Sequence, residues 1–152
     1  MFEQELFAGW GDMDFNSHMK NTAYLDKSAD VRMLYFAEQG FPMAEFMRLR
    51  IGPVVMKDEI EYFRELHLLD RMTVRLTLAG LSDDGSRMVL RNDFLRDGKL
   101  VARVTSTAGW LDLARRKLTC PPEPLLRALQ AISHADDFVT LPSSMQPAAT
   151  GA

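Results

Sequence analysis

The sequence is poor in cysteine and histidine, and this excludes several kinds of site. Its single cysteine, Cys120, cannot form an intrachain disulfide, so a framework of disulfide bonds is excluded. The three histidines do not stand with cysteine at the spacing of a zinc-binding sequence. We therefore expect no structural metal ion.

Net positive charge and long hydrophobic runs are also missing. The formal net charge is −3 and the sequence pI is near 5.6, so there is no global positive field to attract nucleic acid or an anionic membrane. No apolar run approaches the roughly 18 residues of a membrane span, and none near the N-terminus suits export. We expect no nucleic-acid partner, no membrane insertion and a cytoplasmic location.

What is present is an ordinary globular composition, with 47% hydrophobic and 26% charged residues. A chain of 152 residues is long enough to bury a sizeable core. We expect a single domain over residues 1–140. Residues 141–152, rich in proline, serine and alanine, are expected to form a flexible tail.

Hydrophobic periodicity predicts an α+β domain with one long helix. A short strand over residues 2–9 precedes a helix over 22–39, which ends before Gly40. Apolar residues of this helix fall on more than one row, so we expect it to be buried on several sides, as if wrapped by a sheet. A short helix is expected over 121–133, after Pro121-Pro122.

Strand patterns dominate the second half of the chain. An imperfect alternation over 54–69 predicts a strand with a bulge. Clean strands follow and form a meander whose last turn is Asp97-Gly98, a strong hairpin signal. The predicted sheet has about five antiparallel strands. In the last of them we expect an inward row formed by Ala102, Val104, Ser106, Ala108 and Trp110.

The segment between the first strand and the long helix collects the polar groups that chemistry would use. A carboxylate, an amide and an imidazole follow one another at Asp14, Asn16 and His18. A helix that begins near Asn21 leaves its first backbone N–H groups unpaired, and these donors suit an oxygen that gains negative charge. We expect Asp12 to fix the turn rather than take part in chemistry, and Asn21 to cap the helix with its side chain.

This segment resembles the motif of the hot-dog-fold thioesterases, in particular the 4-hydroxybenzoyl-CoA and acyl-CoA or acyl-carrier-protein thioesterases. The matching positions, in the right place relative to strand and helix, are Asp12, Asp14, Asn16, His18, Asn21 and Tyr24. Two positions depart from the usual motif: Ser17, where many members have glycine, and Lys20, where many have asparagine.

The resemblance implies a hot-dog fold and hydrolysis of an acyl thioester without a cofactor. It implies that Asp14 attacks the carbonyl carbon or activates water, that Asn16 and His18 assist, and that the backbone N–H of Asn21 polarises the carbonyl. The substrate would be an acyl-CoA or an acyl carrier protein, and the assembly a homodimer or a dimer of dimers. Guanidinium groups suit phosphate, so the candidates to hold coenzyme A are Ser86, Arg87, Arg91 and Arg103.

Two other functions stay open. An enoyl-thioester hydratase on the same fold has a related motif, although its histidine follows the aspartate by five positions and a proline stands where this chain has Ser17. A non-catalytic acyl-CoA-binding protein is the other alternative, because fold alone does not decide function. The apolar cluster over 41–47 is expected to serve as a pocket lid or a dimer contact.

Overall fold

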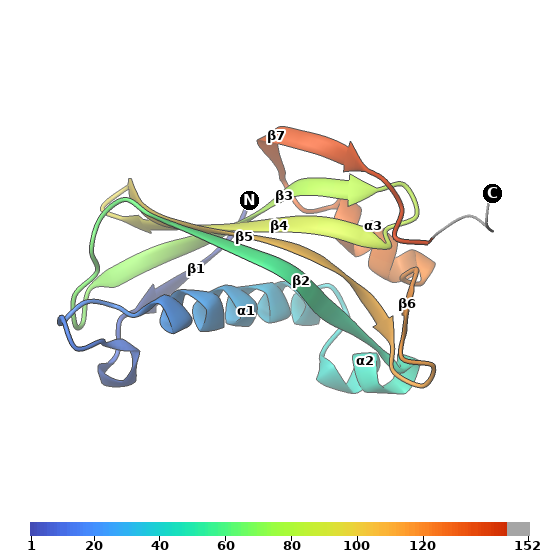
Figure 1. Ribbon diagram of the computed structural model, residues 1–152, viewed down its shortest axis with the longest axis horizontal. Helices are drawn as coiled ribbons and strands as arrows, with labels where there is room; N and C mark the ends of the chain where they lie inside the picture. The colour runs from blue at the N-terminus through green and yellow to red at the C-terminus, as the bar shows by residue number, and fades with distance from the viewer. Residues whose placement is uncertain (146–152) are drawn as a thin grey trace.

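The computed structural model describes residues 1–145, which form one long helix, two short helices, a single turn of 3-10 helix and a seven-stranded sheet. Figure 1 shows these elements along the chain. In chain order they are β1 (Phe2–Phe7), η1 (Trp10–Asp12), α1 (Asn21–Glu38), α2 (Met43–Leu49), β2 (Ile51–Tyr62), β3 (Arg71–Ser82), β4 (Arg87–Arg96), β5 (Lys99–Asp112), β6 (Lys117–Thr119), α3 (Glu123–Gln130) and β7 (His134–Leu141).

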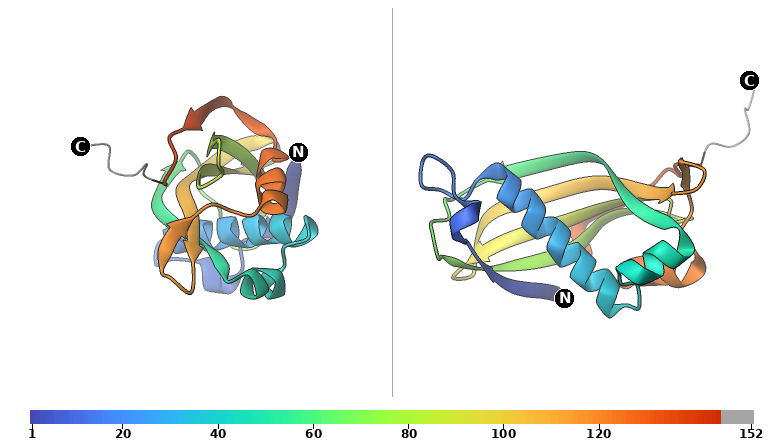
Figure 2. Two further views of the ribbon diagram at one scale, coloured as in Figure 1. Left: turned by 90° about the vertical axis from the view of Figure 1, so that its right-hand side faces the viewer. Right: turned by 90° about the horizontal axis from the view of Figure 1, so that it is seen from below.

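The sheet runs in the order β1-β3-β4-β5-β2, and every neighbouring pair on this path is antiparallel. Strand β6 adds to β5, and β7 pairs with β3 in parallel. Helix α1 lies across one face of the curved sheet (Figures 1 and 2). This confirms the predicted α+β architecture of a long helix against an antiparallel sheet.

The local signals of the second half are confirmed, with one shifted boundary. Asp97 and Gly98 both have positive φ, 52° and 75°, as a tight hairpin turn requires, and β2 contains a register shift between Val55 and Lys57. The prediction of a strand up to residue 69 is wrong. The chain leaves β2 at Tyr62 and turns through a loop over residues 63–70.

One side of α1 faces the sheet, rather than several. Its buried residues form a single helical stripe, namely Ala23, Tyr24, Ser28, Val31, Arg32, Tyr35 and Phe36. The opposite side is solvent-exposed in the protomer, and includes Asp26 and Leu34. The predicted inward row of β5 meets this stripe: Ala102, Val104, Ser106, Ala108 and Trp110 are at most 2% exposed.

Helix α2 and the strands β6 and β7 were not predicted from the sequence. Helix α2 follows Phe41 and buries Phe46 against Trp110, while Met43 and Met47 on its outer side are exposed. Strand β6 pairs with the last residues of β5, and β7 pairs with the second half of β3. Of the C-terminal stretch predicted to be flexible, Leu141 is the last residue of β7 and residues 146–152 lie outside the described residues. Within residues 1–145, no helix is both long and apolar enough to cross a membrane.

Candidate active site

The loop between β1 and α1 is held in place by Asp12. One oxygen of its carboxylate, Oδ2, accepts the N–H of Gly9 at 2.7 Å and lies 3.0 Å from Nζ of Lys27 on α1. Burial by itself raises the pKa of this carboxyl, but the Gly9 bond and the lysine charge outweigh burial and leave the pKa below its usual value. Asp12 therefore ties the loop to the helix, which agrees with the structural role predicted for it.

Asp14 closes the next turn with one carboxylate oxygen and leaves the other unused. Its Oδ1 accepts the backbone N–H groups of Asn16 at 2.8 Å and of His18 at 3.1 Å. Within residues 1–145, Oδ2 has no hydrogen-bond partner. At the tip of this turn Ser17 has φ 65°, in the left-handed region that favours glycine, which explains why glycine is common at this position of the motif. The turn thus fixes the carboxylate while one oxygen stays available for chemistry.

Helix α1 starts without a side-chain cap. The N-cap residue is Lys20, in extended geometry (φ −78°, ψ 157°), and its side chain makes no capping bond. The prediction that Asn21 caps the helix by its side chain is wrong, because Asn21 is already the first helical residue. No acceptor within the described chain takes the backbone N–H of Asn21 or Thr22, so these donors stand free at the positive end of the helix dipole.

Asp14 and the first residue of α1, Asn21, line one cavity of about 480 Å³. Of the residues predicted to be catalytic, Asp14, His18 and Asn21 line it, whereas Asn16 contributes only its backbone bond to Asp14. The remaining wall is formed by Met19, Tyr24, Tyr62, Phe63, Arg64 and Glu65. Burial is the main cause that raises the pKa of Tyr24 to about 12, so its hydroxyl is neutral at the cavity wall.

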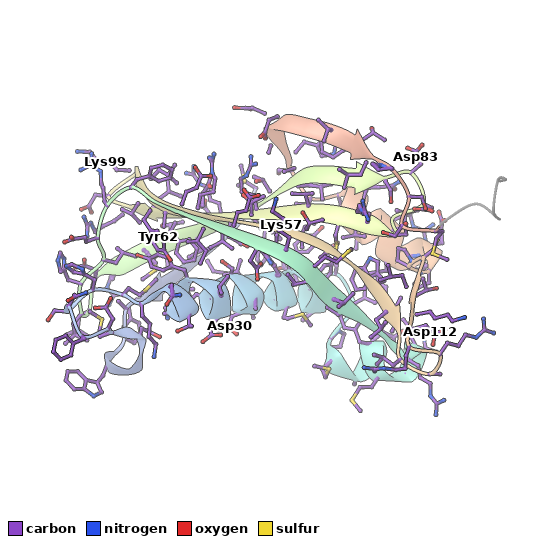
Figure 3. The ribbon with its side chains drawn as sticks, in the orientation of Figure 1. Asp30, Lys57, Tyr62, Asp83, Lys99 and Asp112 are labelled. Atoms are coloured by element: carbon purple, nitrogen blue, oxygen red, sulfur yellow. The ribbon has the colours of Figure 1, made fainter. Side chains whose placement is uncertain are left out.

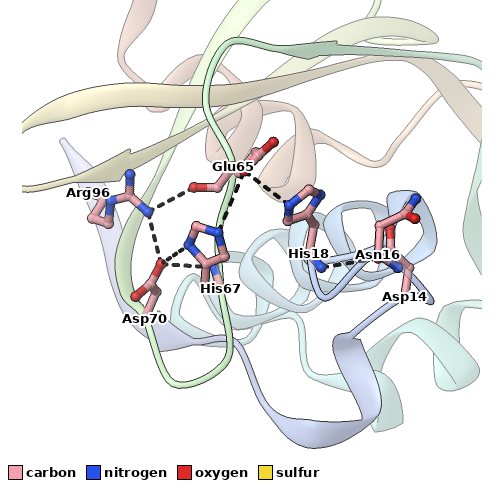
Figure 4. Close-up of polar contacts among 7 residues, drawn as sticks. All are labelled: Asp14, Asn16, His18, Glu65, His67, Asp70 and Arg96. Carbon is pink, nitrogen blue, oxygen red and sulfur yellow. Dashed lines mark hydrogen bonds and ion pairs between the residues drawn. The ribbon is translucent and has the colours of Figure 1, made fainter.

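Part of this wall comes from a segment that sequence reasoning did not single out. The end of β2 and the following loop carry Tyr62, Phe63 and Glu65, and Glu65 places Oε2 at 3.0 Å from Nε2 of His18 (Figure 4). The backbone N–H of Met19 also donates to the carbonyl of Leu66 at 2.8 Å. The loop could not be assigned to the site from its pattern, because its alternation resembled a continuing strand.

Ser86 and Arg87 lie away from this cavity. Arg87 is the first residue of β4 and Ser86 precedes it, next to the turn at Asp83, which is at the opposite end of the protomer from Tyr62 (Figure 3). The Ser86 hydroxyl is buried, donates to Asp84 at 2.7 Å and accepts the N–H of Ser144 at 2.9 Å. Within one chain, these two residues are not brought together with Asp14.

The chain belongs to the thioesterase-like superfamily, whose family model matches residues 8–129. This match covers the loop before α1, α1 itself and the strands β2 to β5, and it confirms the predicted thioesterase family. Among the curated protein sequences compared with the chain, none matches it.

Solved structures share the fold at low sequence identity. A 1,4-dihydroxy-2-naphthoyl-CoA thioesterase from Synechocystis has a TM-score of 0.76 at 18% identity, covering 88% of this chain and 98% of its own. The gentisyl-coenzyme A thioesterase BH1999 has a TM-score of 0.75 at 18% identity, with coverages of 84% and 98%. The protein SAV2348 from Staphylococcus aureus, solved in complex with CoA, has a TM-score of 0.77 at 20% identity, with coverages of 97% and 89%. These likenesses establish the hot-dog fold.

Proposed function

We propose that the protein hydrolyses an acyl-CoA thioester to a free acid and coenzyme A. The observation that carries this proposal is that two residues line one cavity: Asp14, whose carboxylate has a free oxygen, and Asn21, the first residue of α1, whose backbone N–H is unpaired. Thioester hydrolysis needs both a base or nucleophile and a donor to the developing oxyanion.

In the proposed reaction the thioester carbonyl oxygen lies against the N–H of Asn21. Asp14 either removes a proton from a water molecule that attacks the carbonyl carbon, or attacks that carbon itself to form a mixed anhydride that water then hydrolyses. The tetrahedral oxyanion accepts hydrogen bonds from the helix start, the C–S bond breaks, and the thiolate leaves and takes up a proton. His18 and Asn16 assist by orienting the carboxylate and the substrate.

The cavity is suited to an acyl group of moderate size. Its volume of about 480 Å³ lies within the range of roughly 300–1,000 Å³ that is usual for small-molecule sites. Tyr62 and Phe63 expose about half of their surface, 54% and 51%, beside it. Two of the structural relatives are thioesterases of aromatic acyl-CoA compounds, gentisyl-coenzyme A and 1,4-dihydroxy-2-naphthoyl-CoA, which supports including aromatic substrates among those tested. A role of Ser86 and Arg87 in holding coenzyme A stays a prediction, and it requires a second copy of the chain to bring them to the site.

An assay of several acyl thioesters tests this function. We expect the protein to release thiol from at least one of a set of short, long and aromatic acyl-CoA thioesters, detected with a thiol-reactive dye. Crotonyl-CoA is included and its double bond is followed separately, because hydration without thiol release would identify a hydratase. Saturable binding of acyl-CoA with neither reaction would identify a binding protein and refute the proposed activity.

We further propose that the protein forms a homodimer or a dimer of dimers through the free edge of β2. This strand ends the sheet and has an open edge, and exposed edges invite pairing with another chain. Its exposed side chains include the apolar Val55 and Met56, at 49% and 42%, and its last residue, Tyr62, lines the cavity. A second copy would therefore cover Val55 and Met56 and also enclose the candidate site.

Measurement of the mass in solution tests the assembly. We expect a species of two or four times the 17.2 kDa chain by light scattering. A charge at the edge, Val55→Glu, should promote dissociation, because it places a carboxylate within the proposed contact. The matched control is Val139→Glu on β7, which is exposed to a similar extent, 54%, and should leave the mass unchanged. A wild-type monomer at micromolar concentration would contradict this assembly.

A further inference from the structure

Two of the three histidines and one glutamate meet beside the cavity, although they are far apart in the sequence. His18 comes from the loop before α1, whereas Glu65 and His67 come from the loop after β2 (Figure 4). One nitrogen of each histidine and one oxygen of the glutamate all lie within 4.8 Å of one another. We propose that His18, Glu65 and His67 bind one divalent transition-metal ion of the zinc class.

The distances in this cluster suit a small tetrahedral ion. Oε2 of Glu65 lies 3.0 Å from Nε2 of His18 and 3.6 Å from Nε2 of His67. Ligands that bind zinc at about 2.0–2.2 Å in tetrahedral geometry lie roughly 3.3–3.6 Å from one another. The ligand nitrogens of His18 and His67 lie within 4.8 Å of each other, so side-chain rotation can bring all three ligands to these distances. Imidazole nitrogen with a single carboxylate selects zinc-class ions over magnesium, which prefers oxygen ligands.

Other groups hold the ligands in position, as outer groups do around metal sites. The second nitrogen of His67, Nδ1, faces Oδ2 of Asp70 at 3.7 Å, and the same oxygen accepts the backbone N–H of His67 at 2.8 Å. Arg96 uses Nη1 to bind both the Asp70 carboxylate and the carbonyl of Glu65, each at 2.8 Å. These contacts fix the backbone of the loop that carries two of the three ligands.

A backbone hydrogen bond also connects the two loops at a point between the ligands. The N–H of Met19, the residue after His18, donates to the carbonyl of Leu66, which lies between Glu65 and His67, at 2.8 Å. Leu66 itself is fully buried, so this junction is anchored in the core. The three ligands remain partly exposed, with side-chain exposures of 35%, 60% and 55% for His18, Glu65 and His67.

Three protein ligands leave a fourth position open for water. Because His18 and Glu65 also line the cavity that contains Asp14, the ion would lie at the wall of that cavity. The binding proposal does not depend on thioesterase activity, since only the three ligands and their supporting contacts enter it.

Zinc titration of the untagged protein tests the site. In a Cys120→Ser background, which removes the one thiol, we expect calorimetry to find one zinc ion per chain and an excess of magnesium to leave the binding unchanged. Replacing an outer group typically lowers metal affinity about 10–100-fold, so losing a ligand in His67→Ala should lower it at least about 100-fold. Glu65→Gln, which keeps the side-chain shape, should weaken binding as well.

The third histidine provides the matched control. His134 is exposed on β7, outside the cluster, and His134→Ala should bind zinc like the parent protein. Zinc should also raise the thermal midpoint of the parent but not of His67→Ala, because an ion that binds only the folded state stabilises it. Equal zinc binding by the parent, His67→Ala and Glu65→Gln would overturn the proposal, as would no binding by the folded parent. Neither result would bear on thiol release from acyl-CoA.

Discussion

Replacing Asp14 by asparagine is expected to lower kcat for thioester hydrolysis by about 10²–10⁴, the usual contribution of a positioned base. Asparagine retains an oxygen that can accept the N–H groups of Asn16 and His18, so the turn should keep its shape. What it loses is the charge and basicity of the free oxygen. We therefore expect KM to change little, because the substrate-contacting surface stays in place.

The control for this variant is another exposed aspartate on the same part of the chain. Asp26 lies on the outer side of α1, and Asp26→Asn removes the same charge without touching the cavity. Steady-state kinetics on the best acyl-CoA of the assay should show the loss in Asp14→Asn and wild-type kcat in Asp26→Asn. Wild-type turnover by a folded Asp14→Asn protein would remove Asp14 from the chemistry and leave the family assignment standing.

The parts of the fold that depend on local pattern were predictable from the sequence. The alternation in β3 to β5 gave the correct faces, because one side of those strands packs on α1 and the other is polar. The Asp97-Gly98 turn was predictable because two successive positive φ angles favour these residues. The burial of α1 was overestimated, since apolar residues such as Leu34 lie on the side that the protomer leaves exposed.

The site was predictable only where its residues are contiguous. Asp14, His18 and Asn21 belong to one loop and the start of one helix, so their spacing carried the information. Glu65 and His67 reach the same place through the antiparallel pairing of β2 with β5 and through the loop after β2, a long-range arrangement that no short window contains. This loop turns at Leu69, which has φ 70°. Leucine rarely adopts this left-handed conformation, so the sequence does not indicate a turn there.

The oxyanion donor can be removed by a single substitution, because it is a backbone group at a position that tolerates proline. Asn21 is the first residue of α1, where proline is well accommodated since its missing N–H has no partner within the helix. Lys20 already has the extended geometry, φ −78° and ψ 157°, that a residue before proline requires. Asn21→Pro should therefore fold normally and lack the N–H that polarises the thioester.

We expect Asn21→Pro to lower kcat by about 10²–10³, the typical effect of losing one oxyanion donor. Asn21→Ala is the matched control, because it removes the same side chain and keeps the N–H, and it should retain kcat within a few-fold of wild type. Circular dichroism and thermal midpoints would establish that both variants fold. If the two variants lost activity equally, the side chain of Asn21 rather than the backbone N–H would be the functional group; if neither lost activity, the oxyanion would have to be bound elsewhere. A large loss confined to the proline variant would place the negative charge of the transition state at the first turn of α1.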